Sequence, residues 1–216
     1  MLTAVGAAES SNPLSPDTDD VRALRGLLYV HMYAAFEYAM DQSFIRVGQH
    51  VSSMSVARQH LQTPIFSLAL DAEFNSLQTV NAPDKKFRKR IETMLCARDK
   101  SAASIPDTVL SKSMQSVGSG TIALAFEAYG IKKPHLYDLT AKGYIDEVVE
   151  RRHAVAHGRE SPIAVGVRKV LELRVRHDIL YRQSMYVIEC LNEFCGTKNF
   201  VLPRYRRSYP SSGGAA

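Results

Sequence analysis

The chain has 216 residues, of which 45% are hydrophobic and 23% charged, and its formal net charge is +5 at pH 7. This length and composition are typical of one globular domain with a substantial core, and they exclude a disordered chain. The positive excess favours a polyanionic partner such as nucleic acid, although many proteins of this charge bind none.

The pattern of cysteines and of apolar residues indicates the cellular compartment in which the protein is expected. The three cysteines show no C-x-x-C spacing, which favours reduced thiols in the cytoplasm over a disulfide framework. The first residues lack the basic start and apolar stretch of a secretory signal, and no run of 18 apolar residues occurs. We therefore expect a cytoplasmic protein without a membrane partner.

The first quarter of the chain predicts an arm and a long helix. Residues 1–16 are small, polar and proline-containing, and we expect them to be flexible. A helix capped by Asp17 or Thr18 should then run to about residue 50. It is apolar on almost every side, which is typical of a helix that is central to a bundle or covered by a second subunit. Glu37 falls on one of its apolar faces, as a buried or interfacial carboxylate.

The middle of the chain predicts three shorter helices. Pro64 begins the first, over residues 63–77. The second, over residues 82–100, has a basic outer face and apolar residues at core spacing, which are Phe87, Ile91, Met94 and Leu95. Residues 101–120, rich in serine and glycine, should be a mobile connection. The third helix is apolar and ends at Gly130.

The last third predicts two helices and a tail. A helix over residues 144–157 is followed by a long final helix from 162 to about 195. The residues expected to form the core of this final helix are Leu171, Leu173, Ile179, Leu180, Val187, Ile188 and Leu191. Residues 198–216 should be a flexible basic tail. The pattern thus predicts an all-α fold, a bundle of about five to seven helices over residues 17–197 with long first and last helices.

The stretch ERRHAVAHG, residues 150–158, concentrates two arginines and two histidines at the end of a predicted helix. On a helical wheel, Arg152 points to the middle of the apolar face. That face is defined by Ile145, Val148, Val149, Val155 and Ala156. His153 and His157 lie four residues apart on the neighbouring flank, and Gly158 ends the helix beside them.

Three interpretations of this motif remain open. In the first, Arg152 is structural and pairs with a carboxylate such as Glu37, while the histidines are surface residues. In the second, His153 and His157 form an H-x-x-x-H metal pair. Such a pair needs a third ligand, and the residues between the histidines supply no acidic base, so we expect no bound metal.

His31, on the first helix, is expected to be a core histidine.

The third interpretation is cleavage of RNA. A histidine with a pKa near neutrality takes or gives a proton, and an arginine holds the scissile phosphate and offsets the charge that grows on its oxygens. RNA supplies its own nucleophile, the 2′-hydroxyl, so this reaction needs neither a metal nor a cofactor.

In this context the chain resembles the HEPN superfamily of all-α domains, which carry an R-(polar)-x-x-x-H motif. Arg152, His153 and His157 match that motif position by position. The stretch YIDEVVERRHAVAHG is similar to the RNA-ligase/phosphatase-associated and restriction-linked branches. Phe36 and Glu37 match the F-E pair of their opening helix. The chain departs from the family at His153, where asparagine or aspartate is commoner.

The resemblance implies a metal-independent endoribonuclease, often a toxin or phage-defence effector, that works as a homodimer with the two motifs facing across a cleft. His157 would act as general base or acid, Arg152 would bind phosphate, and His153 would assist. Glu37 would pair with Arg152 or position a histidine. An antitoxin or another defence protein is a further expected partner. Other HEPN domains are non-catalytic modules that bind RNA or protein, and that alternative stays open.

Further cations are candidates for contacting RNA. Arg151 and Arg159 flank the motif, and the basic helix adds others, which are Lys85, Lys86, Arg88 and Lys89. A solvated helix face explains that basic helix equally well. The stretch RYRRSY near the carboxyl end mixes arginine and tyrosine in a way that suits single-stranded RNA, or it belongs to the tail.

Overall fold

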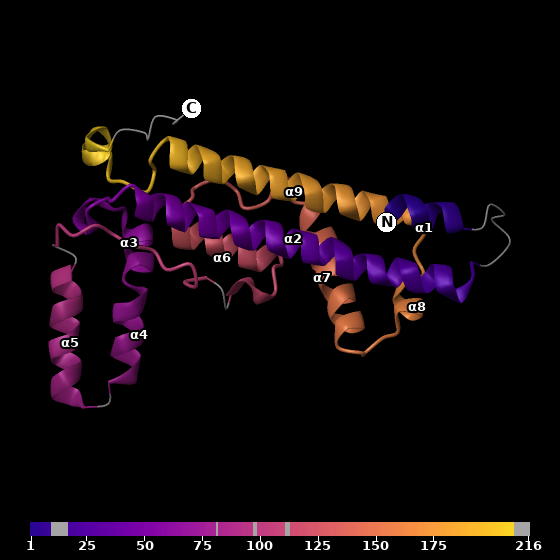
Figure 1. The fold of residues 1–216 in the computed structure, drawn as a ribbon, viewed down its shortest axis with the longest axis horizontal. Helices are drawn as coiled ribbons and strands as arrows, with labels where there is room; N and C mark the ends of the chain where they lie inside the picture. Colours follow the sequence, from indigo (N-terminus) through magenta and orange to yellow (C-terminus); the bar gives the residue numbers. More distant parts are fainter. Residues whose placement is uncertain (10–16, 81, 97–98, 111–112, 210–216) are drawn as a thin grey trace. The chain divides into compact units, whose positions relative to one another are not determined.

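The computed structural model describes residues 1–9, 17–80, 82–96, 99–110 and 113–209. The described residues form helices joined by loops and no β-strand, which confirms the predicted all-α fold (Figure 1). The α-helices are α1 (Leu2–Ala8), α2 (Asp19–Ser53), α3 (Thr63–Ala69), α4 (Asp71–Thr79), α5 (Pro83–Cys96), α6 (Ser119–Tyr129), α7 (Ala141–Ala156), α8 (Pro162–Val165) and α9 (Val170–Gly196). Three short 3₁₀-helices are η1 (Arg58–His60), η2 (Ser113–Gln115) and η3 (Pro203–Ser208).

The chain divides into two compact units. Unit 1 comprises Met1–Met40, Met114–Ile122 and Pro134–Val187. Unit 2 comprises Asp41–Ser113, Ala123–Lys133 and Ile188–Ala216. The long helices α2 and α9 contribute residues to both units, and each unit is therefore described by itself.

Both expected flexible ends contain helical structure. Leu2–Ala8 form α1, and Pro203–Ser208 form η3. The rest of the expected arm, residues 10–16, and the last part of the expected tail, residues 210–216, lie outside the described residues. The predicted boundaries at residues 16 and 197 remain predictions.

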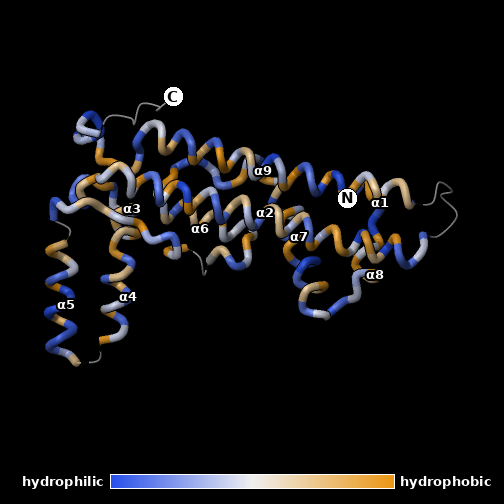
Figure 2. The backbone as a smooth tube through the Cα atoms, viewed as in Figure 1, coloured by the Kyte–Doolittle hydropathy of each residue, from blue (hydrophilic) through white to orange (hydrophobic). Residues whose placement is uncertain are grey.

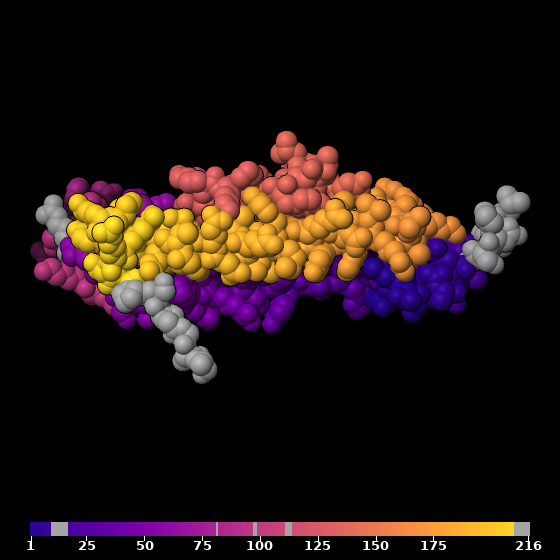
Figure 3. Space-filling view, turned by 90° about the horizontal axis from the view of Figure 1, so that it is seen from above, coloured from indigo at the N-terminus to yellow at the C-terminus, as the bar shows by residue number. Residues whose placement is uncertain are grey.

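In unit 1, a buried arginine holds the amino-terminal helix. Arg25 is 2% exposed and donates to the carboxylates of Glu9 and Asp17, at 3.0 Å each. Glu9 also accepts from the backbone N–H of Val170 at the start of α9 (2.8 Å). These contacts tie α1 to α9, and the two lie side by side in the space-filling view (Figure 3).

Two glycines allow α8 to lie directly on α2. A Cβ atom on Gly26 would meet the backbone oxygen of Pro162 at 2.0 Å, and one on Gly166 would meet that of Arg22 at 1.8 Å. Because only glycine leaves room for this approach, the two backbones are in contact. This close packing also separates α8 from α9, which the sequence predicted as one helix.

Ion pairs hold α7 against α9. The carboxylate of Glu147 on α7 accepts from Arg176 (2.8 Å) and from Arg168 (2.9 Å). Arg176 is 5% exposed, so its charge has left water and depends on this partner. The carboxylate thus fixes the middle of the helix that carries the motif.

Unit 2 is built around aromatic side chains at the end of α6. The hydroxyl of Tyr129 donates to the backbone oxygen of Phe44 (2.9 Å), and burial raises the pKa of this tyrosine above its usual range. Helix α6 ends at Gly130, whose φ of +72° is the left-handed conformation that glycine adopts without strain. The predicted stop at this residue is confirmed.

The 3₁₀-helix η3 packs against η1 through His60. The imidazole stacks on the ring of Tyr205 (3.6 Å between centroids), and its Nδ1 lies 2.8 Å from the hydroxyl of Tyr209. That hydroxyl also accepts from the backbone N–H of Ala57 (3.0 Å). Part of the RYRRSY stretch therefore has a fixed place in the fold.

Several residues predicted to be core are exposed. On α5 these are Phe87, Ile91, Met94 and Leu95, each between 59% and 70% exposed. Leu171 on α9 and His31 on α2 are also exposed, and neither belongs to the core. Periodicity tells which residues share a helix face, but not whether another element covers that face. Helix α5 has one buried residue, Thr93, and Figure 2 shows hydrophilic residues along much of this helix.

Other boundaries differ slightly from prediction. The helix expected over residues 63–77 breaks at Leu70, whose φ of −103° and ψ of 14° lie outside the helical range, and forms α3 and α4. The described helices contain no segment long and apolar enough to span a bilayer.

Candidate functional site

The motif lies at the carboxyl end of α7. Ala141, Ile145 and Val148 form the buried row of this helix, and Arg152 continues the row by one turn. In the last turn Ala154 is buried, whereas Ala156, predicted on the apolar face, is exposed.

A glycine turn ends the helix directly after the motif. Gly158 has a φ of +66°, and the backbone N–H of Arg159 donates back to the oxygen of Ala154 (2.9 Å). His157 is the last residue before this turn, and its N–H still donates to the oxygen of His153 (3.0 Å). The imidazole of His157 is therefore presented at an exposed helix end.

Helix α2 supplies the surroundings of Arg152. The Nη2 atom of Arg152 lies 3.8 Å from a carboxylate oxygen of Glu37, and its Cζ atom lies 4.5 Å from the centre of the Tyr33 ring. The side chains of Arg152 and Glu37 are 24% and 26% exposed. The predicted ion pair is thus present, but it is long and partly open to water, while the aromatic face fixes the plane of the guanidinium.

Tyr33 connects the parts of the site. Its hydroxyl donates to the other carboxylate oxygen of Glu37 (2.9 Å) and accepts from the backbone N–H of Val117 (2.7 Å). The ring is 1% exposed. Burial and the bond to Glu37 raise the pKa of Tyr33, so its hydroxyl remains a donor at neutral pH.

His153 occupies the more enclosed of the two histidine positions. Its Nε2 atom lies 3.3 Å from the hydroxyl of Ser116, and its ring meets the Tyr33 ring edge-on, with centroids 6.4 Å apart. Burial lowers the pKa of His153, and the positive charges of Arg152, His157 and Arg159 lower it further. This imidazole is therefore neutral at physiological pH. The rings of His153 and His157 are 5.7 Å apart.

A carboxylate on α7 fixes the segment that carries Ser116 and Val117. Asp146 accepts from the backbone N–H (3.2 Å) and the hydroxyl (2.9 Å) of Ser119, at the start of α6. Burial alone would raise the pKa of Asp146, but the hydrogen bonds from Lys142 and Ser119 outweigh it and hold the pKa below its usual range. Asp146 therefore stays charged and positions the start of α6 beside the motif.

The structure brings together only some of the predicted site residues. Arg152, His153 and Glu37 form one cluster with His157 at its edge. Arg151 and Arg159 flank it; Arg151 pairs with Glu160 (3.6 Å) and Arg159 is exposed. The other predicted RNA contacts, Lys85, Lys86, Arg88 and Lys89 on α5, belong to unit 2 and are not part of this cluster.

The structure adds Tyr33 and Ser116 to the site, which the sequence did not identify. Tyr33 belongs to the first helix, which is apolar on almost every side, and it lies one turn before Glu37, a spacing that puts the two side chains together. Ser116 comes from a connecting segment, and no sequence pattern links it to His153. Across the described residues, no His, Cys, Asp or Glu side chains gather in a group of three that would hold a metal ion.

The family described as RiboL-PSP-HEPN matches residues 6–177 of the chain. The match covers all of the residues in the cluster. No curated protein and no solved structure matches the chain significantly.

Proposed function

The chain belongs to the RiboL-PSP-HEPN family, and on this premise we propose that it is a metal-independent endoribonuclease. The family match indicates an RNA-related function, and the cleavage reaction is the step proposed beyond it. The observation that carries the proposal is the convergence of one guanidinium and two imidazoles at the open end of α7.

In the proposed reaction the 2′-hydroxyl of RNA attacks the adjacent phosphorus and the 5′-oxygen leaves. The products are a 2′,3′-cyclic phosphate and a 5′-hydroxyl. Negative charge grows on the non-bridging oxygens during the attack, and the guanidinium of Arg152 offsets it. The ring of Tyr33 and the carboxylate of Glu37 hold this guanidinium in one orientation, so little reorganisation is needed.

The two histidines supply proton transfer. His157 lies at the exposed helix end, where it can reach a bound strand and act as general base or acid. His153 is neutral and partly enclosed, so it assists by accepting or relaying a proton together with the Ser116 hydroxyl. In this proposal the two histidines serve the proton that leaves the 2′-hydroxyl and the proton that the 5′-oxygen takes up.

One observation favours the alternative, a non-catalytic module that binds RNA or protein. Arg152 has a carboxylate partner, as a purely structural arginine would. The pair is 3.8 Å long and a quarter exposed, however, and guanidinium has five N–H donors, so phosphate binding remains open to it. The two functions differ in one outcome: the module binds RNA without cleaving it.

The enzyme is proposed to act as a homodimer. Helix α2 exposes a stripe of residues on one face next to Glu37, which are Leu24, Leu27, His31, Ala34, Ala35 and Tyr38. Tyr38 is 67% exposed, and a second copy would cover it. We expect Tyr38→Glu to convert a dimer to a monomer in analytical ultracentrifugation and to lower cleavage. A wild-type protein that is already monomeric at assay concentration would contradict this.

We further propose that the protein is a cytoplasmic toxin or phage-defence effector, restrained by an antitoxin or another defence protein. The three cysteines show no C-x-x-C spacing, which agrees with a reducing compartment. Induced expression of the wild type, but not of His157→Ala, should then arrest growth.

The proposal is tested with purified protein and labelled RNA in the presence of EDTA. We expect cleavage by the wild type and at least a 100-fold lower rate, roughly the contribution of one general acid or base, for Arg152→Ala and His157→Ala. His177→Ala is the matched control, because His177 is half exposed and, among the described residues, its ion-pair partner is its neighbour Asp178. Equal cleavage by all variants would refute the assignment, and RNA binding without cleavage by the wild type would establish the alternative.

A further inference from the structure

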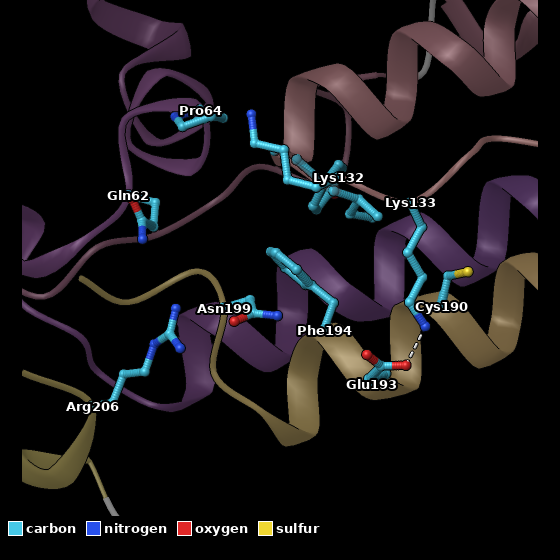
Figure 4. Close-up of a pocket in the computed structure, with 12 residues that line it drawn as sticks. Gln62, Pro64, Lys132, Lys133, Cys190, Glu193, Phe194, Asn199 and Arg206 are labelled. Atoms are coloured by element: carbon cyan, nitrogen blue, oxygen red, sulfur yellow. Dashed lines mark hydrogen bonds and ion pairs between the residues drawn. The ribbon is translucent and has the colours of Figure 1, made fainter. Parts of the chain in front are cut away.

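Unit 2 contains a cavity of about 480 Å³ that the proposed cleavage site does not use (Figure 4). It lies between the start of α3, the segment after α6, the end of α9 and η3. All of its lining residues belong to unit 2, whereas the motif belongs to unit 1. Its volume falls within the range of about 300–1,000 Å³ that is typical of small-molecule sites.

The charged side chains of the cavity leave an excess of two cations. Lys133 pairs with Glu193, so these two charges cancel. Lys132 and Arg206 also line the cavity, and neither has a carboxylate partner within the described parts of the chain. The cavity therefore favours an anionic ligand.

Arg206 is held in place before any ligand binds. Its Nε donates to the backbone oxygen of Val201 (3.0 Å), which leaves the terminal guanidinium nitrogens for a ligand. The 3₁₀-helix that carries it is anchored by the contacts of Tyr209 with His60 and Ala57. A guanidinium fixed in this way is suited to bidentate binding of a phosphate.

The remaining lining offers apolar surface, called the apolar wall below, and two amides. Pro64, Ile131 and Phe194 supply apolar surface, and the side chains of Gln62 and Asn199 also face the cavity (Figure 4). The two side-chain amides make no hydrogen bond to the described residues. Amides of this kind pair with the edges of nucleobases, and apolar surface packs against their planes.

A simpler explanation accounts for only part of this lining. Lys132 follows the carboxyl end of α6, where a cation complements the helix dipole without any ligand. That explanation does not extend to Arg206 or to the amides of Gln62 and Asn199, which come from other segments.

We propose that this cavity binds a nucleotide, with the phosphate on Lys132 and Arg206 and the base against the apolar wall and the amides. The nucleotide is either free or one unit of an RNA strand, and both present the same chemistry. The inference does not depend on RNA cleavage by the motif.

Isothermal titration calorimetry on the full chain tests the proposal, with AMP, CMP, GMP, UMP, adenosine, inorganic phosphate and a six-nucleotide RNA as separate probes. We expect at least one mononucleotide to bind more tightly than about 1 mM, and adenosine and phosphate to bind at least tenfold more weakly. Arg206→Gln and Lys132→Gln should each weaken that binding about tenfold. Arg207→Gln, on the same 3₁₀-helix but outside the cavity, is the matched control and should leave it unchanged.

The outcomes separate the alternatives. Tighter binding of the RNA than of any mononucleotide, with the same loss in Arg206→Gln, identifies a strand as the source of the nucleotide. Equal affinity for phosphate and mononucleotides would overturn the nucleotide assignment, as would an absence of binding or binding that both substitutions leave unchanged. His157→Ala should bind the mononucleotide like the wild type, so failure of this proposal is distinguishable from failure of the cleavage proposal.

Discussion

Replacing Tyr33 with phenylalanine removes one oxygen atom that makes two hydrogen bonds beside the motif. The ring contact with Arg152 is kept, because only the hydroxyl is lost. The backbone N–H of Val117 loses its acceptor at 2.7 Å, and Glu37 loses a donor at 2.9 Å. Tyr33→Phe is thus a specific test of the network that orients Glu37 and the Ser116–Val117 segment.

The expected loss of stability in Tyr33→Phe follows from how deeply each hydrogen-bond partner of the hydroxyl is buried. Val117 is fully buried, so an unsatisfied N–H there costs about 1–3 kcal/mol. Glu37 is a quarter exposed and regains water, so losing its bond to Tyr33 adds about 0.5–1 kcal/mol. We expect the free energy of unfolding to fall by about 1.5–4 kcal/mol in total.

Urea denaturation followed by circular dichroism measures this change. A double-mutant cycle of Tyr33→Phe with Glu37→Gln isolates the bond between the two side chains, with an expected coupling of about 0.5–1 kcal/mol. A total loss below about 0.5 kcal/mol, the range of ordinary surface substitutions, would show that the Tyr33 hydroxyl does not stabilise the fold through these two bonds.

Three further predictions concern the surroundings of the motif and the packing of unit 1. Because the pKa of His153 is lowered on folding, the unfolded chain binds a proton at higher pH than the folded chain, and stability should fall as pH decreases below about 6.5. Urea unfolding at several pH values should show a smaller fall for His153→Gln, and an identical fall would contradict the assigned environment. Gly26→Ala should cost at least about 2 kcal/mol, because the new Cβ would lie 2.0 Å from the oxygen of Pro162, whereas Gly143→Ala, with open space around it, should be neutral or stabilising. Arg25→Ala should cost about 3–5 kcal/mol and increase hydrogen exchange in α1, since it removes the buried guanidinium that pairs with Glu9 and Asp17; unchanged exchange at residues 2–8 would show that Arg25 does not hold this helix.

The helical nature of the chain and most helix positions were predictable from local patterns. Thr18, Pro64 and Gly130 mark helix ends by their own conformational chemistry, and the structure places helix ends at each. The exposure of Phe87 on α5 was not predictable, because it depends on which elements pack against that helix. Local periodicity carries no information about such distant contacts.

The candidate site was predictable only along α7 and at Glu37. Arg152, His153 and His157 are close in sequence, so helix geometry alone sets their relation. Arg152 and Glu37 form a pair although they lie 115 residues apart in the sequence. The helix faces that they occupy made this pair plausible but could not establish it. The contributions of Tyr33 and Ser116 depend on the path of the segment before α6, which tertiary contacts determine.

Cleavage through the 2′-hydroxyl is tested with two RNA oligonucleotides that differ in one oxygen atom. One is an RNA that the protein cleaves. The other has the same sequence but carries a single 2′-deoxy nucleotide immediately 5′ of the scissile phosphate. Both are assayed in EDTA. We expect cleavage of the first to a 2′,3′-cyclic phosphate and no cleavage of the second at that position. Cleavage of the deoxy-substituted strand at the same position would show that the 2′-hydroxyl is not the nucleophile and would contradict the account.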